Sequence, residues 1–309
     1  MSGLARLALL ILLFSAVPVS STSFAVYYGQ LSGKTIGDLK GFEILILPPT
    51  IEPELISSLS RNHTVVGYLS LATVGGWEPW AKAVPKGIVI GKNTNWNEKV
   101  VDFASPAWKR IVLEEAIPYI LSRGFEGVFL DNVDYVDRYP KKKTAMVELI
   151  RAIRERYPGI TIIVNRGFSI KEEIAPYIDY VLFEDFITYY NFSTRRYEIF
   201  KGKELEWELE QVEELKNLGV PILALSYANL SDRKQVSEFG KIVCSYARKY
   251  NVSGVYLAEI SLQRVGIDPC RNSVETGGKR EPEGEPERPG KVCGPGFILA
   301  LTLLWRRFL

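Results

Sequence analysis

The sequence predicts an α/β fold, a (β/α)8 TIM barrel that forms a single catalytic domain. Eight short apolar runs recur along the chain, amphipathic helical segments separate most of them, and glycines stand where helices should end. The apolar runs are continuous rather than alternating, which is typical of parallel strands buried on both faces. The alternative is an open doubly wound sheet, but no glycine-rich dinucleotide or phosphate loop follows any predicted strand.

The strands are predicted in order from the apolar runs. These cover residues 24–28, 42–47, 64–71, 127–131, 161–165, 180–185, 221–227 and 254–259. Helical periodicity separates most of them, most clearly over residues 144–157 and 232–250. About 55 residues lie between the third and fourth strands, a longer connection than a barrel needs, and it includes a long loop of the kind that carries function.

Both ends of the chain carry the features of targeting segments. Residues 1–22 have a basic residue, an apolar run and then small residues, which is the order of a secretory signal peptide. The catalytic domain is expected over 23–268, and the Pro/Glu/Gly-rich residues 271–292 are expected to be a disordered linker. Residues 293–309 resemble the archaeal Cys-Gly-Pro surface-sorting tail.

That resemblance implies that Cys293 is the lipid-attachment residue and that the protein is secreted and tethered to the cell surface, with its tail at the membrane. A weak membrane anchor that stays in place is the alternative. Cys244 and Cys270 could form a disulfide in an exported protein, although Cys244 could instead be a buried free thiol.

Composition and residue types exclude several classes of site. The net charge of +2 argues against a nucleic-acid partner. His63 is the only histidine and precedes the third strand, at the end of the barrel away from the expected active site. A Ser-His-Asp triad or a histidine-based metal site is therefore not expected, and we expect no metal and no cofactor. The protein is expected to be a monomer.

The carboxyl ends of the predicted strands carry polar residues, and in such barrels the active site lies at that end. Asp131 ends the fourth strand and Glu184 the sixth. Two carboxylates facing each other, one protonated and one ionised, are the arrangement that hydrolyses glycosidic bonds. Asp131 and Glu184 are therefore the predicted catalytic pair. Asp131 could instead simply cap the following loop or helix, and of the neighbours Glu184 and Asp185 only one need face the site.

Further strand-end and loop residues are predicted to bind substrate because they are polar or aromatic and lie at the same end. They are Tyr28, Tyr68, Trp77, Asn132, Asp134, Asn165, Arg166, Tyr189, Tyr227 and Glu259. Asp134 could instead be a capping residue. Trp77 and Tyr189, together with Trp80, Tyr135 and Tyr190, could stack against sugar rings, whereas Trp96 and Trp108 are expected to be packing residues.

Three motifs, "GFEGVFLDNVDYVD", "IVNRGF" and "VLFEDF", resemble glycoside hydrolase family 114, the endo-α-1,4-polygalactosaminidases and their relatives. The order of motifs is similar over most of residues 24–262. The resemblance implies a barrel enzyme that cleaves α-1,4-linked galactosaminoglycan internally, without a cofactor. It places the family's catalytic residues on Asp131 and Glu184.

By analogy with barrel hydrolases of α-galactosides, Asp131 would be the nucleophile and Glu184 the acid/base. The sequence departs from the family pattern at Ala72 and Thr73, where relatives have Gly-Glu, and this bears on which sugar is accepted. The alternative function is that of a non-catalytic carbohydrate-binding cell-envelope protein on the same barrel.

Overall fold

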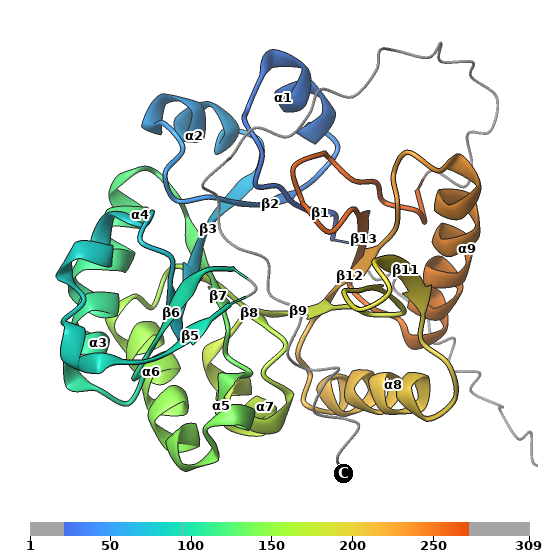
Figure 1. Cartoon of the computed structure of the whole chain (residues 1–309). Helices are drawn as coiled ribbons and strands as arrows, with labels where there is room; N and C mark the ends of the chain where they lie inside the picture. The colour runs from blue at the N-terminus through green and yellow to red at the C-terminus, as the bar shows by residue number, and fades with distance from the viewer. Residues whose placement is uncertain (1–21, 95, 272–309) are drawn as a thin grey trace, which may run out of the picture.

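The computed structural model describes residues 22–94 and 96–271, which form a nearly closed barrel of eight parallel strands surrounded by helices (Figure 1). The barrel strands are β1 (Phe24–Val26), β2 (Ile44–Leu47), β3 (Thr64–Ser70), β7 (Gly127–Asp131), β8 (Thr161–Asn165), β9 (Tyr180–Glu184), β12 (Ile222–Tyr227) and β13 (Gly254–Ala258). They neighbour one another in chain order, which confirms the predicted (β/α)8 fold.

Each barrel strand falls on one of the predicted apolar runs, and nearly every residue in it is buried. The first and last strands approach each other closely, because the backbone N–H of Thr22 donates to the carbonyl of Ser253 at 2.6 Å. Gly254 lies at this seam, where a Cβ atom would stand 2.1 Å from the Thr22 carbonyl oxygen. A residue without a side chain is therefore required where the barrel closes.

Helices follow most of the barrel strands and pack on the outside (Figure 1). Their bounds are α1 (Gly33–Leu39), α2 (Pro53–Leu59), α3 (Pro106–Ile111), α4 (Ile117–Ser122), α5 (Tyr135–Arg138), α6 (Lys143–Arg156), α7 (Lys171–Ile174), α8 (Gly202–Asn217) and α9 (Arg233–Tyr250). A π-helical stretch, Val112–Ala116, joins α3 to α4. Pro118 stands two residues after this stretch and lacks a backbone N–H, which accounts for the wider hydrogen-bonding pattern before it.

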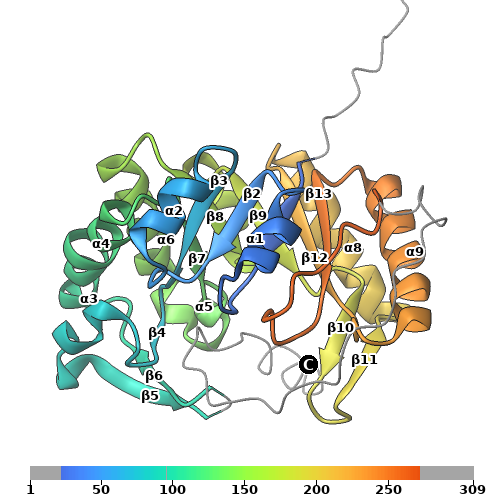
Figure 2. The same ribbon diagram turned by 90° about the horizontal axis from the view of Figure 1, so that it is seen from above.

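Two small antiparallel sheets are added to the barrel. The first contains β4 (Thr73–Val74), β5 (Val89–Asn93) and β6 (Glu98–Val101), and the second pairs β10 (Thr188–Asn191) with β11 (Arg196–Ile199). Figure 2 shows both at the same end of the barrel. The connection after β3, predicted as a long loop, is thus partly a sheet, and the edge-to-face rings of Trp96 and Phe192, 5.8 Å apart, join the two additions.

The interior packing explains several residues outside the site. Trp108 is fully buried and its indole N–H donates to the carbonyl of Leu71 at 2.8 Å, so it is a packing residue as predicted. Trp80 is 4% exposed and packs near Tyr119, which corrects the expectation that its ring faces a sugar. A disulfide joins Cys244 on α9 to Cys270.

No helix among residues 22–94 and 96–271 is long and apolar enough to span a membrane. Cys293 and almost all of the predicted signal peptide, linker and tail lie outside the described residues.

Candidate active site

Three neighbouring strands end in the residues that form the centre of the site. Asp131 closes β7, Asn165 closes β8 and Glu184 closes β9. The residue after each one is in the left-handed backbone region, with φ of 59° at Asn132, 53° at Arg166 and 58° at Asp185. The chain therefore leaves each of the three strands through a residue in the same backbone conformation.

The side-chain amide of Asn165 connects the two predicted catalytic residues. Its Nδ2 donates to Oδ1 of Asp131 at 3.0 Å and to Oε2 of Glu184 at 2.7 Å. Because both oxygens are bonded to one nitrogen, they lie at most about 5.7 Å apart, close to the separation of about 5–5.5 Å in retaining glycosidases and below the roughly 6.5–9.5 Å of inverting ones. The two predicted carboxylates therefore form one site.

Each carboxylate also receives a hydrogen bond from a buried tyrosine. Tyr68 on β3 donates to Oδ2 of Asp131 at 2.7 Å, and Tyr227 on β12 donates to Oε1 of Glu184. Burial and then the nearby carboxylates raise the pKa of both tyrosines well above its ordinary value. Both hydroxyls therefore stay protonated and act as donors.

Burial raises the pKa of Asp131 well above its usual range; the charge of Glu184 adds to this, while the hydrogen bonds from Tyr68 and Asn165 oppose it. Burial also raises the pKa of Glu184, against the hydrogen bonds from Tyr227 and Asn165. Two buried carboxylates this close do not readily ionise together, so the pair favours the state with one proton between them. One acid and one base is what glycoside hydrolysis requires.

A second group of side chains supports Asp131 from the β3 side. The Nδ2 of Asn132 donates to Oγ of Ser70 at 2.9 Å and to Oγ1 of Thr73 at 3.1 Å, and it lies 3.3 Å from Oδ2 of Asp131. The hydroxyls of Ser70 and Thr73 are themselves hydrogen-bonded at 2.8 Å. Thr73 thus belongs to the hydrogen-bonded network that supports the predicted catalytic pair.

Three other predicted substrate-binding residues lie near the pair. Tyr28 is buried with its ring edge-on to Tyr68, the centroids 5.6 Å apart, and Trp77 lies 6.2 Å from Tyr68 on the next segment. Asp134 stands at the start of α5, and burial raises its pKa to about 6 while the charge of Arg166 opposes the rise.

Arg166 and Tyr189, two other predicted substrate-binding residues, are buried and contact protein groups around the site. Arg166 donates through Nη1 to the backbone carbonyl of Glu184 at 2.8 Å, so its head lies behind the strand end. Tyr189 stacks on Phe200 and donates to Glu198 on the neighbouring strand at 2.9 Å. Substrate binding by Tyr189 remains a prediction.

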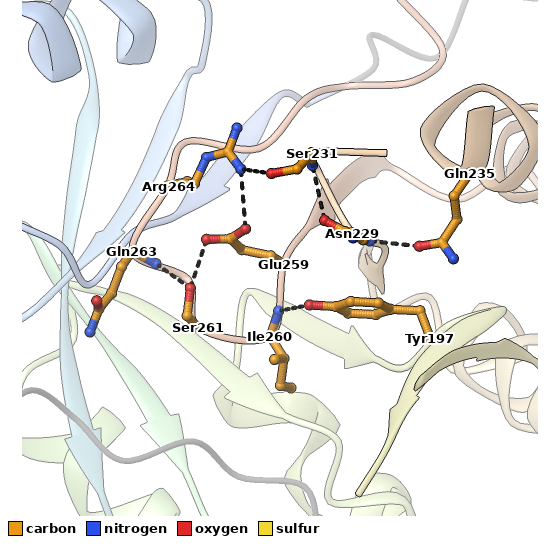
Figure 3. Close-up of polar contacts among 9 residues, drawn as sticks. All are labelled: Tyr197, Asn229, Ser231, Gln235, Glu259, Ile260, Ser261, Gln263 and Arg264. Atoms are coloured by element: carbon orange, nitrogen blue, oxygen red, sulfur yellow. Dashed lines mark hydrogen bonds and ion pairs between the residues drawn. The ribbon is translucent and has the colours of Figure 1, made fainter. Parts of the chain in front are cut away.

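Glu259 belongs to a polar network on the rim, between the segments that follow β12 and β13 (Figure 3). Its Oε1 accepts from Ser261 at 2.9 Å, and its Oε2 lies 3.5 Å from Nη1 of Arg264, which also donates to Ser231 at 2.9 Å. The network joins two neighbouring loops at the mouth, and substrate binding by Glu259 remains a prediction.

Two residues that the sequence did not single out contribute to the site. Thr188 on β10 donates through Oγ1 to the Tyr227 carbonyl at 2.8 Å and accepts from the Tyr227 N–H at 3.1 Å, so it fixes the backbone of the residue that holds Glu184. Glu98 is a buried carboxylate on β6. Its charge adds to the burial of Tyr68 and the charge of Asp131 in raising the pKa of Tyr68. Neither Thr188 nor Glu98 lies at a barrel-strand end, which is why no sequence signal marked them.

Among the described residues, no group of three or more His, Cys, Asp or Glu side chains is arranged to hold a metal ion. Two carboxylates with neutral donors are the residue types that glycoside hydrolysis uses.

Comparison with known proteins shows the family and the fold. The model of glycoside-hydrolase family GH114 matches residues 21–274. An uncharacterized protein of Deinococcus radiodurans is 22% identical over 188 residues, which cover 56% of this chain and 59% of that protein. The match thus spans about three-fifths of the length of that relative.

Two solved structures share the fold. The glycoside hydrolase domain of PelA from Pseudomonas aeruginosa superposes with a TM-score of 0.69 at 21% identity, covering 80% of this chain and 98% of that domain. Ega3 of Aspergillus fumigatus, solved in complex with galactosamine, has a TM-score of 0.64 at 16% identity and covers 80% and 95% of the two chains.

Proposed function

The chain belongs to glycoside-hydrolase family GH114, and we propose that it is an endo-acting hydrolase of α-1,4-linked galactosaminoglycan-type polysaccharide. The observation that carries the proposal is the contact of both Asp131 and Glu184 with the single amide of Asn165. It brings an acid and a base within the distance that cleavage with retention of configuration requires.

The reaction then has two steps. Glu184, as the acid, gives its proton to the glycosidic oxygen while the bond from that oxygen to C1 breaks and Asp131 forms a bond to C1. In the second step, the Glu184 carboxylate takes a proton from water, the water oxygen bonds to C1, and the bond to Asp131 breaks. No cofactor enters either step.

The number of donors on each carboxylate bears on this division of roles. Asp131 has three side-chain partners, from Tyr68, Asn165 and Asn132, whereas Glu184 has two, from Tyr227 and Asn165. Hydrogen bonds from neutral donors favour the ionised form of a carboxylate. The donors favour an ionised Asp131, whereas burial, which raises the pKa of Asp131 well above its usual range, and the charge of Arg166, which lowers the pKa of Glu184, act in the other direction. The assignment of Asp131 as nucleophile and Glu184 as acid/base therefore rests on the analogy with barrel hydrolases of α-galactosides.

An amino-sugar polymer suits the charges around the pair. The charge of Asp134 acts on Glu184, and that of the buried Glu98 acts on Tyr68, the hydrogen-bond donor to Asp131. An ammonium-bearing sugar would be attracted to these carboxylates. Galactosamine was bound to the Aspergillus fumigatus relative in its crystal, which supports the same class of ligand. Trp77, beside Tyr68, offers a ring against which a sugar face can stack.

The test is reducing-end release from α-1,4-galactosaminoglycan at several degrees of acetylation, with Asp131→Asn and Glu184→Gln in parallel. Release by the wild type and loss of at least 100-fold in both variants is expected. If a folded wild type releases nothing from this or any other α-glycan yet still binds one, the carbohydrate-binding alternative replaces the proposal.

Azide distinguishes the two roles. With Glu184→Ala, azide should attack the covalent intermediate and give a glycosyl azide of the same anomeric configuration as the substrate. With Asp131→Ala, azide should take the place of the nucleophile and give the opposite configuration. The reverse pattern would exchange the roles of Asp131 and Glu184.

We also propose that the protein is exported and held at the cell surface as a monomer, with Cys293 as the lipid-attachment residue. The disulfide between Cys244 and Cys270 supports an oxidising compartment, since such bonds are rare in the cytosol. Surface labelling of cells and mass spectrometry of the purified protein test this. If the wild type, like Cys293→Ser, has the mass of the protein without lipid, the attachment is contradicted.

A further inference from the structure

Arg166 lies behind the catalytic pair, with a side chain only 5% exposed. Its Nη1 donates to the backbone carbonyl oxygen of Glu184 at 2.8 Å. That carbonyl belongs to the last residue of β9, and the next residue, Asp185, already leaves the strand in the left-handed region. The guanidinium therefore fixes the peptide from which the acid/base side chain projects.

The guanidinium is held on two other sides. It lies 4.6 Å from the ring centre of Phe168 and 5.9 Å from that of Phe183, a cation–π arrangement. Its Nη2 is 3.8 Å from Oε1 of Glu208, which is 1% exposed and reaches in from α8. A buried charge is tolerated only when it is paired, so Arg166 and Glu208 depend on each other.

The backbone of Arg166 indicates that these contacts are selected. Its φ is 53°, a left-handed conformation that Asn and Asp adopt several times more readily than other residues with side chains. The equivalent positions after β7 and β9 are indeed Asn132 and Asp185. An arginine accepts the same turn at a cost in conformational energy, which its buried contacts must outweigh.

We propose that Arg166 is a positioning residue for Glu184, which anchors the end of β9 and sets the protonation of Glu184 through a fixed positive charge, itself moderated by Glu208. This replaces the expectation that Arg166 binds substrate. It rests on the proposed function in that Glu184 is taken as the acid/base. Helix α8, on the outside of the barrel, thus contributes to the position and protonation of Glu184 through Glu208.

Charged and polar groups on several neighbouring elements act on Glu184. Asp131 and Asp134 face it from β7 and the segment after it, and Asp185 follows it in the chain. The hydroxyls of Tyr227 on β12 and Tyr28 beyond β1 lie close by. The hydrogen bonds from Tyr227 and Asn165 lower the pKa of Glu184 most, and the positive charge of Arg166 lowers it further.

The two members of the buried pair should therefore act in opposite directions. In Arg166→Gln the positive charge is gone and Glu184 should titrate at higher pH than in the wild type. In Glu208→Gln the charge of Arg166 is no longer offset and Glu184 should titrate at lower pH. With charges this close, the midpoints in the two variants should lie about one pH unit or more apart.

The measurement is carboxyl ¹³C NMR of protein labelled at glutamate, in which the resonance absent from Glu184→Gln identifies Glu184. It needs no turnover, so it tests the inference even if the proposed substrate is wrong. Where activity is found, the limb of the kcat pH profile due to Glu184 should move in the same directions. Unmoved midpoints, or movement in the same direction in both variants, would overturn the inference.

Two further variants separate charge from fold. Glu214→Gln, on the same helix, removes an exposed partner of Lys171 and should leave Glu184 unchanged. Arg166→Lys keeps the charge but cannot hold the Glu184 carbonyl and Glu208 together, so kcat should fall with little movement of the titration. If Arg166→Gln does not fold, Glu208→Gln is tested alone, since glutamine is nearly identical in shape to glutamate. A lower titration midpoint of Glu184 in that variant supports the inference, and an unchanged midpoint refutes it.

Discussion

The hydrogen bond from Tyr68 to Asp131 offers the most direct check on the catalytic geometry. In Tyr68→Phe the hydroxyl that lies 2.7 Å from Oδ2 of Asp131 is lost. The ring keeps its contacts with Tyr28, Phe129 and Trp77, so packing is nearly unchanged. The change therefore isolates a single donor to Asp131, the proposed nucleophile.

The size of the effect follows from the kind of bond. A hydrogen bond to a charged group contributes about 1.5–3 kcal/mol, which corresponds to a loss of roughly 10- to 150-fold in kcat/KM. Burial raises the pKa of Asp131 and the Tyr68 hydroxyl opposes that rise, so removing the hydroxyl raises the pKa further. The acid limb of the profile should move to higher pH, and the loss should be greatest on that limb.

The assay is the pH dependence of reducing-end release from a soluble amino-sugar polymer. Tyr256→Phe is the matched control, because Tyr256 is equally buried but its hydroxyl accepts from the Gly266 N–H and does not contact Asp131. The control should lose stability without moving the limb. If Tyr68→Phe lowers activity equally at every pH, or hardly at all, the role given to this bond is wrong.

Three other changes have defined outcomes. The folded wild type binds the Asp131 proton more tightly than the unfolded chain, so its stability falls as pH rises through the raised pKa of Asp131. Asp131→Asn removes this loss, and its free energy of unfolding should exceed that of the wild type by more as pH rises. Urea titrations at several pH values check this. Reducing the bond between Cys244 and Cys270, which closes a 26-residue separation, should cost about 3.5 kcal/mol in the chain-entropy view, and equal Tm values with and without reductant would contradict it. Thr188→Val should cost about 1–3 kcal/mol in stability through the unpaired backbone of Tyr227, and a further drop in kcat beyond that of an equally destabilised core variant would show that the loss reaches Glu184.

The barrel was predictable because its strands are buried on both faces, so each reads as an unbroken apolar run that ends at a polar residue. All eight runs correspond to strands, and Asp131 and Glu184 stand where runs end. The small sheets were not predictable, because β6 and β11 are short and mix charged with apolar residues, as loops also do.

The direction of a side chain at a strand end was equally beyond the sequence. Asn165 and Arg166 are adjacent and both polar, yet one faces the carboxylates and the other lies behind Glu184. The left-handed turn at Arg166 decides this, and residue type does not signal it, since arginine rarely adopts that conformation. Glu208 was hidden for a similar reason, because an acid on a helix is ordinarily an exposed residue.

The disulfide has a mechanical consequence. The covalent ring that it closes contains β13 and the rim segment with Glu259, because these lie between Cys244 and Cys270. A pull on the chain beyond Cys270 therefore passes through the two sulfur atoms into α9, an 18-residue helix, and bypasses the strand at the barrel seam. While the disulfide is intact, a force applied to the chain after Cys270 does not pull on β13 or on the loop with Glu259. Once the disulfide is reduced, the same force acts on β13 first.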